Sequence, residues 1–502
     1  MPLAVLSDVE ALRHIRETRS RWPMTTADQA ERLIPLAQPS FKPSFRFDKS
    51  EPIFTIGSCF ARNIEKQLLI EGYNVALSQF QPPDDPAFLA ESETLLNRFT
   101  AQSIASELAW ALSPGQPFPE AFYFEVPRLG WYDLQLSPIL PPSPREVVEA
   151  RREAIRRYVA LAAQARVFIM TLGLAEAWFD TQTGQYLNAQ PPSRSRKQSP
   201  GRFQFHLLDY GQVMQGLETV HALLARFGRP DVKILLTVSP VALRTTFAGD
   251  DVMSAYIYMK SVLRSAAEAF VRGHDNVDYF PSYESVMLSD RAFAWREDQA
   301  HVSDEIVRVN VLRMLQAYAA EGTGGTDAAG TVRGYVHVKA AREAVAAGAT
   351  ARADAAYRAA VQAAPDEALI LLEYGRFLRT RRRLAEAARM VERSLARGSA
   401  VYGGWHVLGQ IHLSARRWLQ AYEAAAKARE HQPKHPGVVN LSADAARRLG
   451  RLDEALVFAQ QHRALAPESE PSRLRLEALQ RRAAGQRGSG LAGLFKRLVG
   501  SF

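Results

Sequence analysis

The sequence contains a single cysteine, Cys59, among 502 residues. One cysteine excludes an internal disulfide and any zinc site built from cysteines. Long apolar runs are also missing, since no uninterrupted stretch approaches the about 20 residues that a membrane-spanning helix needs. Asp8 and Glu10 interrupt the first apolar residues, which is not typical of a secretion signal. These absences favour a cytoplasmic protein, and we expect no metal and no cofactor.

Acidic residues are in the minority only toward the C-terminus. From residue 323 onward, 29 lysines and arginines face 16 aspartates and glutamates, whereas the first 322 residues hold 33 against 37. The net charge of +9 therefore comes from the C-terminal part. Such a surface attracts acidic partners or is simply solvated. We expect an acidic protein segment as the partner, and no nucleic acid.

Four apolar runs rich in β-branched residues are typical of buried strands: 52–57, 166–173, 232–240 and 276–283. Segments with helical apolar spacing lie between and after them. This alternation predicts a parallel sheet with helices on both faces. In such sheets, functional residues gather at the carboxyl ends of the strands.

A 34-residue period marks the C-terminal part. Four alanines follow one another at intervals of 34 residues: Ala353, Ala387, Ala421 and Ala455. A second series with the same interval consists of Pro365, Ser399, Pro433 and Pro467. Within one unit, the tetratricopeptide pattern is matched by Trp405, Leu408, Gly409, Ala421, Ala428 and Pro433. The period predicts tetratricopeptide-like repeats, an all-α solenoid that binds protein partners on its concave face.

The expected organisation is an N-terminal extension at 1–50, an α/β domain at 51–320, a Gly/Thr/Ala linker at 321–333, repeats at 334–470, and a capping helix with a basic amphipathic tail at 471–502. The tail has two interpretations. It could lie on a membrane surface, or it could dock on the repeats or be a frayed terminus. We favour docking or fraying over membrane contact.

Cys59 lies in the stretch "IFTIGSCFA", where a predicted strand turns into a predicted helix. Gly57 permits a tight corner, and the helix N-terminus lowers the pKa of a nearby thiol. Either Cys59 or the adjacent Ser58 could be a nucleophile at this turn. The alternative is a small apolar cysteine buried under the helix.

Asp298 and His301 lie three residues apart in "DQAHVS". At this spacing the carboxylate can orient the imidazole, so that the histidine can act as a base. In "TLGLAEAWFD", a strand end meets a turn at Gly173, followed by Glu176. This turn could supply an oxyanion donor or a wall of the substrate site, or it could be an ordinary strand–helix connection.

These motifs resemble one family. "GSCFA" is the signature of the GSCFA family, which is grouped with the SGNH/GDSL hydrolases, and "TLGLAEAWFD", "LLTVSPVAL", "YFPSYE" and "DQAHVS" agree with it. The resemblance covers about residues 40 to 320. It implies a three-layer α/β/α flavodoxin-like sandwich. By analogy with the superfamily it also implies an esterase or acyltransferase, acting on a glycan or sugar ester in polysaccharide modification.

The resemblance assigns roles by position. Asp298 and His301 match the D-x-x-H block of the superfamily. In the first block, Gly57 matches the glycine, Cys59 falls where the nucleophilic serine stands, and Ser58 falls where the aspartate stands.

The third block, G-x-N-D, aligns with Gly173 to Glu176 and lacks the oxyanion asparagine. Asn97 is a candidate substitute donor. We therefore predict an ester hydrolase or O-acyltransferase with Cys59, or Ser58, as nucleophile. The alternative is a catalytically silent ligand-binding domain joined to a protein-interaction scaffold.

Overall fold

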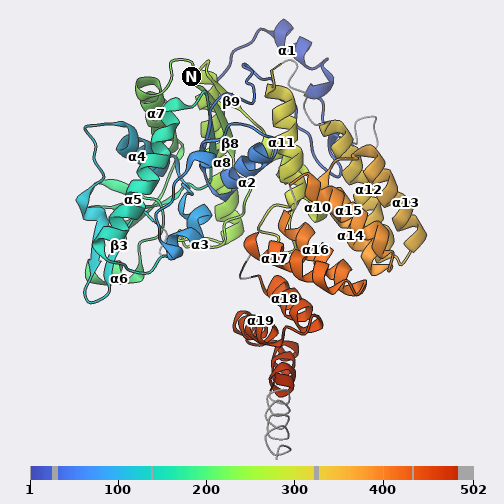
Figure 1. Cartoon of the computed structure of the whole chain (residues 1–502). Coiled ribbons are helices and arrows are strands. Elements are labelled where there is room, and N and C mark those ends of the chain that lie inside the picture. Colours follow the sequence, from blue (N-terminus) through green and yellow to red (C-terminus); the bar gives the residue numbers. More distant parts are fainter. Residues whose placement is uncertain are drawn as a thin grey trace, which may run out of the picture. The chain divides into compact units, whose positions relative to one another are not determined.

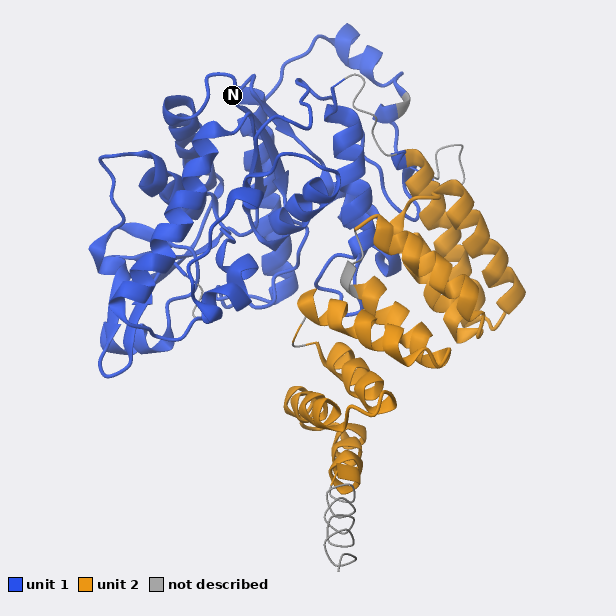
Figure 2. Ribbon diagram, in the orientation of Figure 1, with its two compact units in different colours: residues 1–328 blue, residues 329–502 orange. Residues whose placement is uncertain are grey.

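The computed structural model describes residues 2–24, 32–136, 139–320, 327–398, 401–431, 433 and 435–483. The chain forms two compact units, residues 1–328 and 329–502 (Figure 2). Helix α12 (Ala328–Ala346) begins within the stretch 321–333 that was expected to be a linker. The predicted amphipathic tail lies outside the described residues. None of the described helices is both long and apolar enough to cross a membrane.

A four-stranded parallel sheet forms the centre of the first unit, in the strand order β1-β4-β8-β9. The strands are β1 (Ile53–Gly57), β4 (Val167–Leu172), β8 (Lys233–Val238) and β9 (Val277–Tyr279). Each strand comes from one of the four apolar runs, so the predicted parallel sheet is confirmed. In register, Phe54 pairs with Phe168, and Phe168 pairs with Ile234.

Helices cover both faces of this sheet. Phe54, Phe168 and Ile234 belong to one apolar core together with residues of α4, α5, α7 and α8. Alternate side chains point to the other face, where Thr55 donates to Glu65 of α2 at 2.6 Å. Helices α2 and α9 pack on that face, and α11 packs on both of them. Helix α11 lies beside α2 in Figure 1. The helices of this unit are α1 (Asp8–His14), α2 (Cys59–Ile70), α3 (Pro86–Leu95), α4 (Ala101–Leu112), α5 (Arg145–Ala160), α6 (Ser193–Gln198), α7 (Tyr210–Phe227), α8 (Val252–Gly273), α9 (Ser282–Leu288), α10 (Arg291–Ala294) and α11 (Asp304–Tyr318).

Two small antiparallel sheets accompany the parallel one, and the sequence did not predict them. One pairs β2 (Tyr123–Val126) with β3 (Gly130–Asp133). The other has the order β6-β5-β7, with strands β5 (Glu176–Asp180), β6 (Gln185–Leu187) and β7 (Phe203–Leu207). The turn after β4 therefore leads into a strand, β5, and not into a helix.

The end of the N-terminal extension is part of the α/β unit. The Phe47 N–H donates to the Tyr318 carbonyl at 2.9 Å, and the Ala320 N–H donates to the Phe47 carbonyl at 3.0 Å. Phe47 is 1% exposed. The boundary expected at residue 50 thus divides a continuous packed segment.

Helix pairs build the second unit and confirm the predicted tetratricopeptide-like repeats. The second helices begin 34 residues apart, and each buries one alanine of the sequence grid in its first turn. Residues 470–483 are helical, and Leu479 packs against Ala446, Ala455 and Ala459, as a capping helix does. After α12, the helices are α13 (Thr350–Ala363), α14 (Ala368–Thr380), α15 (Leu384–Ala396), α16 (Val401–Ser414), α17 (Trp418–His431), α18 (Pro436–Arg448) and α19 (Leu452–Leu465).

Candidate active site

The turn between β1 and α2 holds Gly57, Ser58 and Cys59 at the carboxyl end of the parallel sheet. Gly57 has φ +142°, and a Cβ there would lie 2.2 Å from the Thr171 Oγ1 on the neighbouring strand. Only glycine fits such a backbone. The Arg98 N–H donates to the Gly57 carbonyl at 2.7 Å. The turn is therefore held closely against its surroundings.

Ser58 and Cys59 have different environments. The Ser58 Oγ accepts the Phe60 N–H at 3.3 Å and so caps α2, and the Ser58 N–H donates to the Thr171 hydroxyl at 3.2 Å. Ser58 is 4% exposed. Cys59 is the first residue of α2 and is partly exposed. The serine oxygen thus serves the helix cap.

A cavity of about 340 Å³ opens beside this turn and is lined by both Ser58 and Cys59. Trp178 contacts two other aromatic residues of the lining. The centroid of its ring lies 5.9 Å from that of Phe205 and 5.2 Å from that of Phe247. The walls are mainly apolar, so the cavity suits an apolar ligand group. Its apolar lining includes Phe99, Leu174, Ala177, Trp178, Leu187, Phe205, Val241, Leu243 and Phe247.

Lys260 of α8 also lines this cavity and is 1% exposed. Its Nζ donates to the Gly173 carbonyl at 2.8 Å, and among the described residues Cys59, not a carboxylate, is the acidic group that acts on it. Burial lowers the pKa of Lys260 to about 7, and the nearby Cys59 acts in the opposite direction. Sequence reasoning missed this lysine. The sequence signal that could have indicated it is its position on α8, because Lys260 lies on the apolar face that contains Met259 and Leu263.

The Cys59 thiol experiences opposing influences. Burial raises its pKa, whereas the Lys260 ammonium and the N–H groups of Phe60 and of Cys59 itself act to lower it. A thiolate there would have a positive partner and helix N–H donors in a largely apolar cavity. The chemistry this allows is attack on a carbonyl carbon held by the cavity.

Gly173 and Glu176 also line the cavity. The Gly173 N–H donates to the Phe99 carbonyl at 3.1 Å, so it is occupied as a donor. The Glu176 carboxylate accepts the Thr246 hydroxyl at 2.5 Å and the Phe247 N–H at 3.3 Å. In this geometry both residues form the wall of the site.

Asp298 and His301 come together just before α11. Asp298 Oδ2 lies 2.5 Å from His301 Nδ1. The pKa of Asp298 is held well below its usual range by hydrogen bonds from the backbone N–H of His301, the His301 side chain and the Ala300 N–H. Both side chains are about half exposed, and neither is among the described residues that line the cavity. Their loop is tied to the cavity lining, since the Ala242 N–H donates to the Ala300 carbonyl at 3.2 Å.

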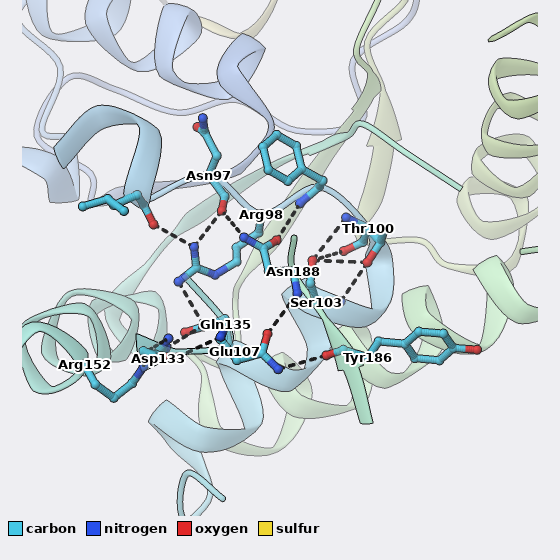
Figure 3. Close-up of polar contacts among 12 residues, drawn as sticks. Asn97, Arg98, Thr100, Ser103, Glu107, Asp133, Gln135, Arg152, Tyr186 and Asn188 are labelled. Atoms are coloured by element: carbon cyan, nitrogen blue, oxygen red, sulfur yellow. Dashed lines mark hydrogen bonds and ion pairs between the residues drawn. The ribbon is translucent and has the colours of Figure 1, made fainter. Parts of the chain in front are cut away.

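Asn97, the proposed substitute donor, is 5% exposed. Its backbone carbonyl accepts Arg98 at 2.6 Å and the Asn188 amide at 2.8 Å, while its side chain points away from this polar network (Figure 3). The Asn97 Oδ1 is buried without a hydrogen-bond partner among the described residues. Its neighbours Phe99 and Asn188, not Asn97, belong to the described cavity lining.

Buried ion pairs support this side of the cavity (Figure 3). Glu107 lies 2.9 Å from Arg98 and 2.7 Å from Arg152, and Arg152 lies 2.6 Å from Asp133. All four side chains are almost fully buried. Because Arg98 precedes Phe99 directly, the network holds the segment that forms part of the cavity wall. Within the described residues, no three His, Cys, Asp or Glu side chains gather so as to hold a metal ion.

The family comparison concerns the α/β unit. Residues 52–313 match the GSCFA family, and the chain therefore belongs to the GSCFA family. The match includes both the turn with Cys59 and the loop with His301. No curated protein matches the chain.

Among solved structures, the chain is similar to MamA of Desulfovibrio magneticus RS-1, with 13% identity and a TM-score of 0.29 over 33% of this chain and 93% of that chain. It is also similar to YrrB, described as a TPR protein with an unusual peptide-binding site, with 18% identity and a TM-score of 0.27 over 30% and 76%. PilW, a type IV pilus biogenesis factor, is 16% identical with a TM-score of 0.29 over 40% and 88%.

Proposed function

We propose that the α/β unit is an SGNH-like esterase or O-acyltransferase that forms a thioester on Cys59. The observation that carries this proposal is the position of Cys59, at the first turn of α2 and open to an apolar cavity. The strand order supports an SGNH-type sandwich, because Val75 forms a parallel bridge to Ile53. The bridge adds a remnant of a fifth strand to the sheet beside β1.

The cavity indicates the kind of acyl group. Trp178, Phe205 and Phe247 enclose a largely apolar space next to the thiol, which favours an apolar acyl chain over a charged one. In this proposal the alcohol part of the ester lies outside the apolar walls of the cavity. The family resemblance favours a sugar or glycan hydroxyl in that place.

In this proposal the Asp298–His301 dyad acts on the acyl acceptor, which is the water or alcohol that attacks the thioester. A thiolate needs no base once it is formed, whereas the water or alcohol that resolves the thioester must lose a proton. The bond between Ala300 and the cavity residue Ala242 supports a position of the dyad near the cavity. His301 is thus assigned to deacylation.

The experiment uses p-nitrophenyl esters of acetyl, butyryl and octanoyl groups. We expect a covalent acyl adduct on the Cys59 peptide by mass spectrometry, formed fastest with a longer chain and absent in Cys59→Ala. His301→Ala should accumulate the adduct, because acylation continues while deacylation slows. Ser58→Ala should still form it. Turnover that survives Cys59→Ala would contradict the thioester.

The same experiment tests the alternative of a catalytically silent ligand-binding domain. If the wild type forms no adduct with any of the esters, the result favours the ligand-binding domain over the enzyme. Intrinsic tryptophan fluorescence then remains as a readout, because Trp178 lines the cavity.

We also propose that the repeat unit binds an acidic protein segment. A groove of about 390 Å³ lies among its helices and contains Arg376, Arg379 and His406. Glu373, an acidic residue of this groove, is already engaged by Arg342 and Tyr357. The excess of basic residues after residue 323 supports the same partner.

Fluorescence anisotropy with a labelled Asp/Glu-rich peptide tests this proposal. Binding should weaken with salt, and it should be lost in the double variant Arg376→Glu/Arg379→Glu. A second double variant, Arg447→Glu/Arg448→Glu, makes the same change of charge outside the groove lining and serves as the matched control. Equal binding by the double variant and the control would exclude the groove.

A further inference from the structure

Lys260 is a buried base that the proposed roles of Cys59 and His301 do not use. Its ammonium is almost completely removed from water, which is costly for a charge unless it is paired. Its one hydrogen-bond acceptor among the described residues is the Gly173 carbonyl. Both Lys260 and Cys59 line the same cavity. The combination of a buried amine and a thiol in one apolar cavity calls for a chemical explanation.

We propose that Lys260 is the proton acceptor of Cys59 and the counter-charge of its thiolate. The inference rests on the proposed function for its use in acyl transfer, but the ionisation of Cys59 can be tested without any acyl donor. The neutral amine accepts the thiol proton, and the resulting ammonium stabilises the thiolate across the low-dielectric cavity. His301 then remains free for the acceptor hydroxyl.

The step balances without a further reactant. The S–H bond of Cys59 breaks, and its proton forms a bond with the lone pair of Nζ. When the thiolate attacks an ester, a C–S bond forms and the C–O bond to the alcohol breaks. The leaving alkoxide takes the proton from Nζ, which restores the neutral amine and releases the alcohol.

Other titratable groups near the pair already have partners or lie apart from it. The Tyr256 ring lies 5.6 Å from Nζ, and its hydroxyl donates to the Pro240 carbonyl at 2.8 Å. Glu176 is held by Thr246, and Arg244 is an exposed residue of the cavity lining. Among the described residues, the other charged groups that meet α8 or α2 are paired as well: Arg62 and Tyr158 with Glu65, Lys66 with Glu93, Arg308 with Glu71, Arg264 with Glu268 and Glu284, Arg272 with Glu268, Tyr279 with Glu284, and His274 with Glu218 and His221.

Alkylation by iodoacetamide tests the proposal, because the full chain has only one thiol. The rate of labelling is measured against pH for the wild type, Lys260→Met, Lys260→Arg and His301→Ala. We expect the apparent pKa of alkylation to rise by at least one unit in Lys260→Met, which slows labelling at neutral pH by about tenfold. Lys260→Arg should restore fast labelling because it keeps the positive charge, and His301→Ala should match the wild type.

The possible outcomes distinguish an electrostatic effect of Lys260 on Cys59 from loss of folding and from the acyl transfer itself. Loss of folding would accelerate labelling toward its rate in urea, which is opposite to the expected slowing. Superimposable profiles of the wild type and Lys260→Met would overturn the proposal, as would a profile that shifts in His301→Ala instead. A shifted profile without any acyl adduct would retain the role of Lys260 and reject the acyl transfer.

Discussion

At the residue scale, the backbone of Gly57 decides whether the turn before α2 can form. A methyl group at this position meets two oxygens of Thr171, at 2.2 and 2.3 Å, and the backbone is already in a region that other residues rarely adopt. Gly72 offers a matched comparison. It has φ +80° but nothing within 4 Å of an added Cβ. The two glycines thus separate a steric clash from backbone strain.

We predict that Gly57→Ala lowers the free energy of unfolding by about 3 kcal/mol or more, because overpacking and strain add. Gly72→Ala should cost about 1 kcal/mol, from strain alone. Urea unfolding followed by circular dichroism measures both. Equal effects of the two substitutions would show that Thr171 moves aside at no cost.

Lys260 should make stability depend on pH. Its pKa is lowered to about 7 in the folded protein and is about 10.4 in the unfolded chain. Between these values the unfolded chain binds more protons, so the free energy of unfolding rises with pH by up to about 1.4 kcal/mol per unit. Below about pH 7 both states are protonated, and the contribution is constant.

The measurement compares Cys59→Ala with Cys59→Ala/Lys260→Met, which removes the titration of the thiol from both proteins. The free energy of unfolding should rise between pH 7 and pH 9 only where Lys260 is present. A difference between the two proteins that does not change with pH would contradict a neutral Lys260.

At the element scale, apolar runs and spacing predicted the parallel strands and the repeats, because both patterns are local in the sequence. The antiparallel strands were missed because they are short and partly exposed. In β7, Phe203 and Phe205 alternate with polar residues as in a half-buried strand, but five residues carry little signal. The pairing of β7 with β5 depends on tertiary structure.

The candidate site, too, could be predicted from the sequence only in part. The turn with Cys59 and the spacing of Asp298 and His301 are visible in the sequence, and their catalytic roles stay predictions. Lys260 could not be assigned to the site, since a lysine on a helix usually reaches water. Only the packing of α8 on the sheet shows that this lysine is enclosed.

Close packing of α16 and α17 gives a prediction for the repeats. Ala421 is completely buried in α17, and a Cβ at Gly409 of α16 would lie 3.5 Å from the Ala421 carbonyl oxygen. We expect Ala421→Leu to destabilise the protein by about 1–3 kcal/mol through overpacking. The exposed Glu423 of the same helix is the control, because Glu423→Leu adds similar apolar volume in solvent. Thermal unfolding followed by helical circular dichroism compares them.

At the scale of the whole molecule, each unit has its own core. The core of the α/β unit contains residues of the parallel sheet and of the helices on one face, all within its own chain segment. The repeats bury separate clusters. The last element that the α/β unit needs is α11, whose Tyr318 donates to Asp278 at 2.9 Å and accepts Phe47 through its carbonyl.

We therefore predict that a fragment of residues 1–326 folds and labels at Cys59 at the rate of the full chain, because every described residue of the cavity lining lies before residue 261. A fragment of residues 1–303 lacks α11, which contributes ten buried residues, and should be insoluble or labelled as fast as in urea. Analytical size exclusion and iodoacetamide labelling measure both fragments. If 1–326 labelled as fast as in urea, the repeats would be required for the fold of the α/β unit. If 1–303 behaved like the full chain, α11 would be dispensable and the boundary of the unit would lie earlier.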